Sequence, residues 1–154
     1  MRFKRLPFFK INKKLALSVK WERCNDSAWF EMTTTTERRP IYRKYANLYF
    51  SIGDDSFKLT AFQPQSLFQK EGWGNYLFIP FGDESNGNQT YGGGRYVEIR
   101  IDLGKETVLL DFNKSYNPYC AYSERYSCPK IPIENILDIK INAGVKYPAN
   151  KYHH

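Results

Sequence analysis

Residues 41–62 read IYRKYANLYFSIGDDSFKLTAF and carry the clearest β-hairpin pattern in the chain. Two runs rich in aromatic and β-branched residues, 41–52 and 57–62, flank the turn sequence GDDS. Such residues favour strands, and glycine and aspartate favour the tight turns that connect antiparallel strands. This stretch therefore predicts two paired antiparallel strands near the middle of the chain.

Further strand patterns extend outward on both sides of this hairpin. They have strand composition or alternate in polarity, and they lie at residues 14–22, 28–34, 76–81, 95–102, 107–112 and 136–142. The run 76–81 is apolar throughout, as expected for a strand buried on both faces. The segments 95–102 and 107–112 flank the turn sequence LGKE and predict a second hairpin, and 136–142 is expected to be a closing strand. One helical turn is expected within 65–71.

The composition of the whole chain also favours a sheet. Of 154 residues, 17% are aromatic, with 12 Tyr and 11 Phe, and long amphipathic helical stretches are absent. About eight strands joined by tight turns, without the spacing of βαβ units, predict an all-β fold, an antiparallel sandwich or flattened barrel with one long irregular loop and little helix. The length suits a single β domain over residues 1–154.

The net charge of +7 is concentrated at the N-terminus. Residues 1–20 carry seven basic and no acidic residues, which leaves 16 basic and 16 acidic residues in the rest. These cations are interleaved with apolar residues, which favours an edge strand with its apolar face inward and its lysines outward. A basic arm that follows phosphates is the weaker alternative, because no nucleic-acid-binding motif accompanies the charge. We therefore expect no nucleic-acid partner.

No apolar run approaches the roughly 20 residues that a membrane-spanning helix needs. Lys13 and Lys14 interrupt the segment that would follow the basic start of a signal peptide. We therefore expect a protein without a membrane span, a monomer or small oligomer, in the cytoplasm unless the chain is a truncated form of an exported protein.

Two loops contain the candidate ligand-binding residues. The first is a glycine-rich loop, residues 82–94. Its three consecutive glycines can adopt positive φ and turn N–H groups toward an anion, and Arg95, which follows them, can form two hydrogen bonds to a carboxylate or phosphate. The second loop, residues 113–134, supplies hydroxyls, amides and aromatic faces. We predict a pocket for a small polar or anionic ligand between them, lined by Tyr91, Gly92, Gly93, Gly94, Arg95, Asp111, Asn113, Tyr116, Asn117, Cys120, Tyr122, Cys128 and Glu134.

Structural roles compete with each of these assignments. The glycines can form a tight bend, with Arg95 paired to Asp111 or Glu134 inside the protein. Asp and Asn side chains often cap turns. For Cys120 and Cys128, three states compete: reduced thiols packed as small apolar groups, a disulfide, and a redox or metal pair.

Several chemistries are excluded by the residues present. The only histidines, His153 and His154, end the chain, so no Ser-His-Asp or Cys-His arrangement is expected inside the domain. The cysteines lack the CxxC spacing of a zinc site, and the glycines match no nucleotide-binding motif, so we expect neither metal nor cofactor. An enzyme that uses Asp83, Asp111 or Glu134 as general acid or base is one alternative. A structural or partner-binding module with a flat apolar patch is another.

Four stretches carry a more specific signal: FEMTTTTERRPIYRKY, NYLFIPFGDESNGNQTYGGGRYVEI, LLDFNKSYNPYCAYSERYSCP and PIENILDIKINAG. They resemble the running signature of a bacterial and archaeal family, domain of unknown function 1684, from Pro7 to Tyr147. The resemblance implies no established reaction, substrate or cofactor. Members of this family usually begin with a further helical segment, and some with a secretion signal, so this chain is expected to be a truncated or late-starting form.

Overall fold

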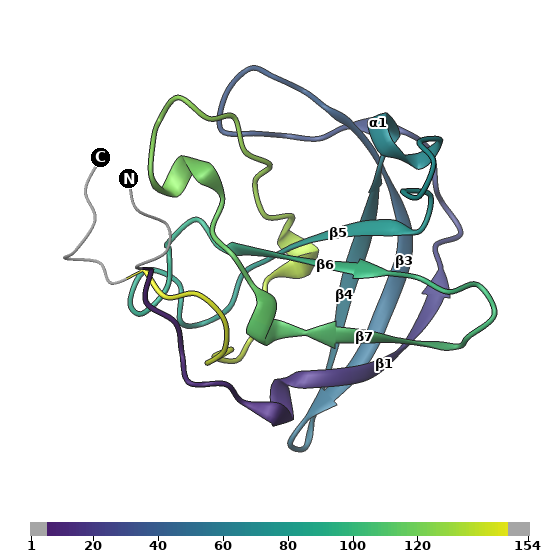
Figure 1. Ribbon diagram of the computed structural model, residues 1–154. Coiled ribbons are helices and arrows are strands. Elements are labelled where there is room, and N and C mark those ends of the chain that lie inside the picture. Colours follow the sequence, from purple (N-terminus) through teal and green to yellow (C-terminus); the bar gives the residue numbers. More distant parts are fainter. Residues whose placement is uncertain (1–5, 148–154) are drawn as a thin grey trace.

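The computed structural model describes residues 6–147 and forms one antiparallel sheet that curls into a half-barrel (Figure 1). Its strands are β1 (Ala16–Arg23), β2 (Phe30–Glu31), β3 (Ile41–Ile52), β4 (Asp55–Pro64), β5 (Tyr76–Phe81), β6 (Arg95–Arg100) and β7 (Thr107–Asp111). Helical structure in this range consists of α1 (Gln65–Phe68) and the 3-10 turns Lys13–Leu15, Phe112–Lys114, Tyr119–Ala121 and Ile133–Asn135. The predicted all-β fold class is confirmed.

The predicted hairpin at residues 41–62 forms the centre of the sheet. β3 pairs with β4 from Tyr42–Pro64 to Ile52–Asp55, with one bulge between Lys44 and Ala46. The turn consists of Gly53 and Asp54, and Gly53 has a φ of 61°. Positive φ at this position costs glycine little, so the local sequence sets the register of the longest pairing in the fold.

β1 is an internal strand, so the prediction of an edge strand with lysines outward is wrong. The strand order is β6-β5-β4-β3-β1-β7, and β1 pairs with both β3 and β7. The inward face predicted for it is correct, since Leu15 and Val19 are buried and Leu17 and Trp21 pack against the core. Lys10, Lys13 and Lys14 lie exposed in the segment that precedes the strand.

The predicted second hairpin does not form a ladder. β6 and β7 are strands, but they stand at opposite ends of the sheet order and face each other across the open side of the half-barrel (Figure 1). β7 pairs with β1 instead, which places Val108 beside Val19 and Leu110 beside Leu17 in the core. Burial of these apolar side chains competes with the local pairing that the short connection favours.

The predicted closing strand at residues 136–142 is also absent. The segment alternates in burial as expected, with Leu137 and Ile141 inward, but it joins the sheet only through an isolated bridge between Gly82 and Ile136. Side chains satisfy part of its backbone: the N–H of Ile141 donates to Asp83 Oδ2 at 2.7 Å. A polar side chain thus takes the place of a neighbouring strand.

Two smaller predictions can be compared directly. Of the predicted strand 28–34, only Phe30–Glu31 forms a strand, and Thr34 makes an isolated bridge to Pro129. In contrast, β5 has the predicted bounds and is buried from Leu77 to Phe81. The helical turn expected within 65–71 is α1. Among residues 6–147, no helix has the length and apolarity that crossing a membrane requires.

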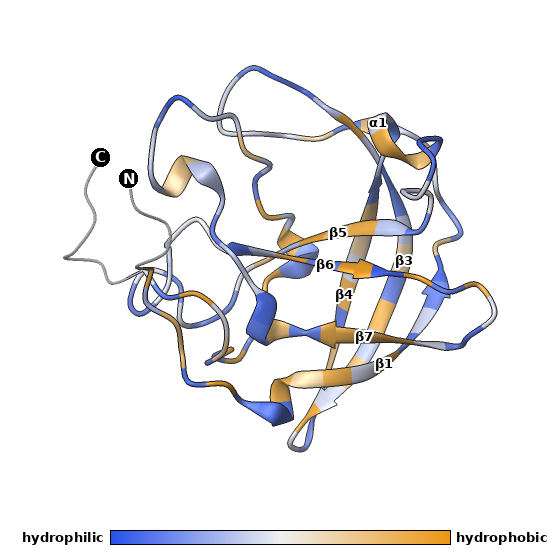
Figure 2. Cartoon of the chain, viewed as in Figure 1, coloured by the Kyte–Doolittle hydropathy of each residue, from blue (hydrophilic) through white to orange (hydrophobic). Residues whose placement is uncertain are grey.

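The core fills the inside of the curl, and a second apolar cluster covers part of the outer face. Hydrophobic and hydrophilic residues alternate along strands such as β6 (Figure 2). The main cluster includes Leu48, Leu77 and Val97. The second contains Met32, Phe62, Phe78, Tyr96, Cys120 and Cys128. It joins the outer side of the sheet to the Cys120–Cys128 segment and so fixes that segment beside the glycine-rich loop.

Candidate functional site

A cavity of about 340 Å³ lies between the glycine-rich loop and the segment that contains Cys120 and Cys128. The two loops predicted to form a pocket therefore lie side by side. The residues around this cavity come from both loops and from two neighbouring segments, and they are Thr35, Gly82, Asn86, Tyr91, Gly92, Gly93, Gly94, Pro118, Cys120, Pro129, Lys130, Ile131 and Ile136. Its volume is at the lower end of the range for small-molecule pockets, about 300–1,000 Å³.

Close packing explains two of the three glycines. Gly94 has a φ of 89°, and an added Cβ would lie 2.5 Å from Ile131 Cγ1. An added Cβ at Gly93 would lie 2.6 Å from the ring of Tyr91. Gly92 is looser, since the nearest atom to an added Cβ is 3.7 Å away. The alternative that the glycines form a tight bend is therefore correct for Gly93 and Gly94. These two residues shape the loop and also line the cavity.

The loop also offers backbone donors. The N–H of Gly94 donates to the carbonyl of Tyr91 at 3.1 Å. Among the hydrogen bonds of residues 6–147, none has the N–H of Gly92 or Gly93 as its donor. These two N–H groups belong to residues that line the cavity, so they can donate to a ligand oxygen.

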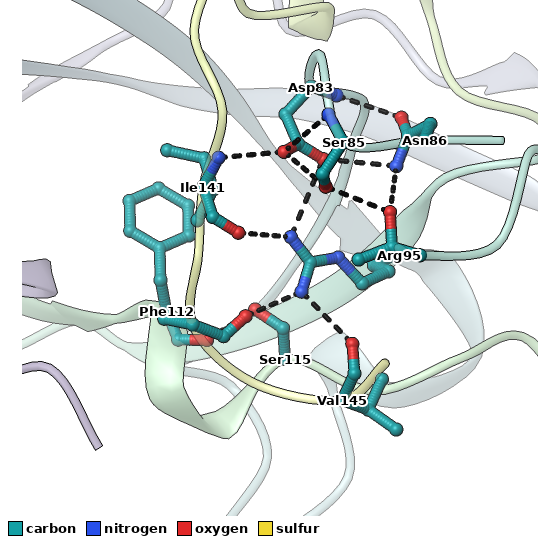
Figure 3. Close-up of polar contacts among 10 residues, drawn as sticks. Asp83, Ser85, Asn86, Arg95, Phe112, Ser115, Ile141 and Val145 are labelled. Atoms are coloured by element: carbon teal, nitrogen blue, oxygen red, sulfur yellow. Dashed lines mark hydrogen bonds and ion pairs between the residues drawn. The ribbon is translucent and has the colours of Figure 1, made fainter. Parts of the chain in front are cut away.

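Arg95 does not line this cavity. Its side chain is fully buried and forms an ion pair with Asp83, with 3.4 Å between Nη2 and Oδ1 (Figure 3). Burial lowers the pKa of the Arg95 guanidinium, and the charge of Asp83 opposes this effect. The alternative of an internal ion pair is thus correct in kind, but the partner is Asp83 and neither Asp111 nor Glu134.

The guanidinium of Arg95 holds the C-terminal segment in place. Its Nη2 donates to the carbonyl of Ile141 at 2.9 Å, and its Nη1 donates to the carbonyls of Ala143 and Val145 at 2.5 and 3.2 Å. Asp83 is held in turn by the hydroxyl of Ser85 at 2.6 Å. A buried ion pair with this many hydrogen bonds is a structural clamp, because both terminal nitrogens of the guanidinium and both oxygens of the carboxylate are already bonded within the protein.

The cavity wall includes Cys120, which contacts Cys128. The Cys120 N–H donates to Cys128 Sγ at 3.2 Å, and both residues are buried and reduced. Cys120 and Tyr91 both line the cavity. Burial, followed by the contact with Cys128, raises the pKa of Cys120 to about 12. Burial and the neighbouring Cys120 likewise raise the pKa of Tyr91 to about 12.

Several predicted site residues instead organise the chain. The Asn113 amide donates to the carbonyl of Asn12 and accepts from its N–H, both at 2.9 Å, which fixes the segment before β1. Asn117 donates to the hydroxyl of Tyr122 at 2.6 Å, and its buried Oδ1 has no hydrogen-bond partner among the described residues. Glu134 forms a surface ion pair with Lys44 at 2.6 Å.

Asp111 and Tyr116 line a second cavity, of about 460 Å³, between β6 and β7 on the open side of the half-barrel. Glu98 also lines it and accepts hydrogen bonds at Oε2 from the hydroxyls of Tyr76, at 2.8 Å, and Tyr116. Burial, then the hydrogen bond to Glu98, raises the pKa of Tyr116. The predicted residue set therefore divides between two cavities and the structural contacts around them.

The sequence prediction missed part of the first cavity. Lys130, Ile131 and Ile136 follow Cys128 and line the cavity beside the glycines. Lys130 is held in place because its backbone N–H donates to the carbonyl of Thr33 at 3.0 Å. A lysine within CPK looks like an ordinary surface residue in the sequence, so only its position in the fold identifies it. Among residues 6–147, no three His, Cys, Asp or Glu side chains are grouped so that they could hold a metal ion.

Comparisons with known proteins give a family and a related structure. The family described as "Protein of unknown function (DUF1684)" matches residues 1–146. Among solved structures, the chain is similar to an uncharacterized protein of Haloarcula marismortui whose structure was determined in solution by NMR. The two share 31% sequence identity with a TM-score of 0.73, and the match covers 92% of this chain and 76% of the other. No curated protein matches the chain.

Proposed function

The chain belongs to the DUF1684 family, and we propose that it is a non-catalytic binding protein for a small anionic ligand with an apolar body. The binding site is the cavity between the glycine-rich loop and the Cys120–Cys128 segment. One observation carries the proposal. Lys130 is the only charged side chain among the lining residues, which all lie in the described part of the chain, and most of the others are apolar or present backbone.

The residues that line the cavity suit both the anionic group and the apolar body of the proposed ligand. Ile131, Ile136 and Pro118 provide apolar surface, and Ile136 remains 58% exposed at the cavity. Lys130 provides a cation, and the N–H groups of Gly92 and Gly93 are available as donors. An apolar pocket with a few polar groups that fix orientation is the usual form of a small-molecule site. A carboxylate or phosphate attached to a short aliphatic or aromatic body satisfies both kinds of lining.

The hydrolase alternative lacks the groups that it needs in this cavity. Two carboxyl groups facing a cleft at about 5 to 9.5 Å are required for acid–base hydrolysis of a glycoside. Asp and Glu are absent from the cavity-lining residues, which all fall within 6–147. The nearby carboxylate of Asp83 is buried and accepts from Arg95, Ser85 and the Ile141 N–H. Binding without catalysis is therefore the simpler reading of this site.

The test uses matched pairs of anionic and neutral compounds. Benzoate, phenylacetate and 3-methylbutanoate are compared with their amides by thermal unfolding and by native mass spectrometry. A ligand that binds only the folded state stabilises it by about 2.7 kcal/mol at 100 times its Kd. We expect at least one carboxylate to raise the melting temperature and its amide to do so less.

The variant Lys130→Met assigns the binding to this cavity. Loss of one charge-assisted hydrogen bond, about 1.5–3 kcal/mol, corresponds to a roughly tenfold or larger rise in Kd. Lys140→Met is the matched control, because Lys140 is exposed and does not line the cavity. The proposal is wrong if none of the carboxylates binds, or if both variants weaken binding equally.

A further inference from the structure

The two buried cysteines of the site lie in direct contact. Cys128 Sγ is 3.2 Å from the backbone nitrogen of Cys120, which lies two bonds from the Cys120 Cβ. Two cysteines that approach in this way can be joined with little movement of the backbone, since a disulfide needs Cβ atoms about 3.5–4.5 Å apart.

Both ends of the intervening loop are held by other contacts. Cys120 lies in the 3-10 turn Tyr119–Ala121. In this turn the N–H of Ala121 donates to the carbonyl of Pro118. Thr35 forms two hydrogen bonds with the backbone of Cys128. The Cys128 N–H donates to Thr35 Oγ1 at 3.2 Å, and the Cys128 carbonyl accepts from the Thr35 N–H at 3.0 Å. The scaffold therefore keeps the thiols together in the reduced state.

Small molecules have a route to one of the two thiols. Both cysteines belong to the apolar cluster with Met32 and Phe78, but Cys120 also lines the cavity and Cys128 does not. An oxidant in the cavity therefore meets Cys120 first, and Cys128 is positioned to react second. If the two thiols served only to fill the apolar cluster, neither of them would need to line the cavity.

We propose that Cys120 and Cys128 form a reversible redox pair that a small disulfide in the cavity converts into an intramolecular disulfide. The Cys120 thiol gives up its proton, and the resulting thiolate attacks one sulfur of the small disulfide. The S–S bond of the small disulfide breaks, and the leaving thiolate takes up a proton and becomes the first free thiol. The Cys128 thiolate then attacks the Cys120 sulfur of the mixed disulfide and releases the second thiol. The protein loses two protons and two electrons, and the small disulfide gains them as two thiols.

Oxidation changes the wall of the cavity. The Cys120 sulfur loses its proton and becomes bonded to Cys128, so the group that Cys120 contributes to the cavity wall changes from a thiol to a disulfide. Tyr91 packs against Gly93 and lines the same cavity. The redox state of the pair therefore changes the surface that a ligand meets. This last consequence rests on the proposed function, whereas formation of the disulfide does not.

The experiment treats the native reduced protein with hydroxyethyl disulfide until the reaction reaches equilibrium. Intact-mass measurement follows the expected loss of about 2 Da. Trypsin then separates the two cysteines, because Arg125 lies between them, and Cys24 falls in a third peptide. We expect the peptides 115–125 and 126–130 to be joined, and dithiothreitol to release them.

The cysteine variants serve as controls. Cys24→Ser is expected to form the same cross-link. Cys128→Ser is expected to stop at the mixed disulfide on Cys120, with one hydroxyethylthio group added. The proposal is wrong if both cysteines of the wild type carry separate adducts, if either pairs with Cys24, or if the native protein stays reduced while the urea-unfolded protein reacts. None of these outcomes depends on ligand binding, so failure here leaves the proposed function to its own test.

Discussion

Replacing Arg95 by methionine tests the clamp that holds the C-terminal segment. The guanidinium donates four hydrogen bonds, to Asp83 and to the carbonyls of Ile141, Ala143 and Val145 (Figure 3). Its removal leaves a buried carboxylate without its counter-charge and three carbonyls without this donor. Breaking a buried ion pair on one side costs about 3–5 kcal/mol. We expect Arg95→Met to lower the free energy of unfolding by that amount, out of about 5–15 kcal/mol for a typical domain.

Two contributions set the magnitude within this range. Asp83 keeps its bonds from Ser85, Asn86 and the Ile141 N–H, which limits the loss. Arg95 Nε is itself buried without a partner among the described residues, so its removal relieves a small cost. Lysine cannot reproduce the planar fork of the guanidinium, and Arg95→Lys is therefore expected to recover little of the loss.

The assay is urea unfolding followed by tryptophan fluorescence and circular dichroism. The matched control is Arg125→Met, because Arg125 is exposed and forms no ion pair in the described structure. A change within about 0.5 kcal/mol is expected for this control. Hydrogen exchange gives a local readout, in which amides near Ile141 lose protection in Arg95→Met before the central strands do.

A double-mutant cycle identifies the pair itself. Asp83→Asn combined with Arg95→Met is expected to cost at least about 1 kcal/mol less than the sum of the single changes, since residues in one network couple by about 0.5–3 kcal/mol. The reasoning is refuted if Arg95→Met is no more destabilised than Arg125→Met, or if the two changes at the pair are simply additive.

Three further predictions concern the loops and the central strands. Gly94→Ala, where φ is 89° and an added Cβ would meet a side-chain atom at 2.5 Å, is expected to destabilise the protein by about 1–3 kcal/mol, whereas Gly92→Ala, with 3.7 Å of space, should stay within about 1 kcal/mol in urea unfolding. Asn135 bonds to backbone groups of Thr60 and Pro80, so Asn135→Ala is expected to cost about 2–4 kcal/mol and the exposed control Asn142→Ala little; equal effects would show that these bonds of Asn135 do not stabilise the fold. Burial and the adjacent Cys120 raise the pKa of Tyr91 to about 12 from its ordinary value of 10, so the folded state favours the neutral hydroxyl; the stability this gives is present below pH 10 and lost as the pH rises toward about 12. Tyr91→Phe is expected to lose less stability over that range, and identical alkaline profiles for the two proteins would overturn the assignment.

Strands were predictable from the sequence where burial and local pairing agree. β5 reads as a run of apolar residues because both faces of the sheet are covered there. β3 and β4 follow from the strand-favouring residues on both sides of the turn that begins at Gly53. The partners of β1 and β7 were not predictable, because alternation shows which face is inward and carries no information about which strand lies alongside.

The candidate site was predictable as a pair of loops, but the roles of its residues were not. Arg95 follows three glycines, a context that suits an anion site and a buried clamp equally well. The distinction depends on Asp83, a residue of the polar turn after β5 whose pairing with Arg95 the sequence does not indicate. Lys130 shows the opposite case, since a residue typical of a solvated surface lines the cavity. Residue type gives the available chemistry, and only long-range packing decides where it is used.

The connection between β6 and β7 links the two ends of the sheet. Residues 101–106 form a short loop, Leu103 is 76% exposed, and no ladder joins the two strands on either side. Lengthening this loop breaks no strand pairing, and each doubling of a flexible loop costs only about 0.6 kcal/mol in closure entropy. The position between Leu103 and Gly104 is therefore suited to carry an inserted reporter, such as a peptide tag or a fluorescent protein, next to the open side of the half-barrel.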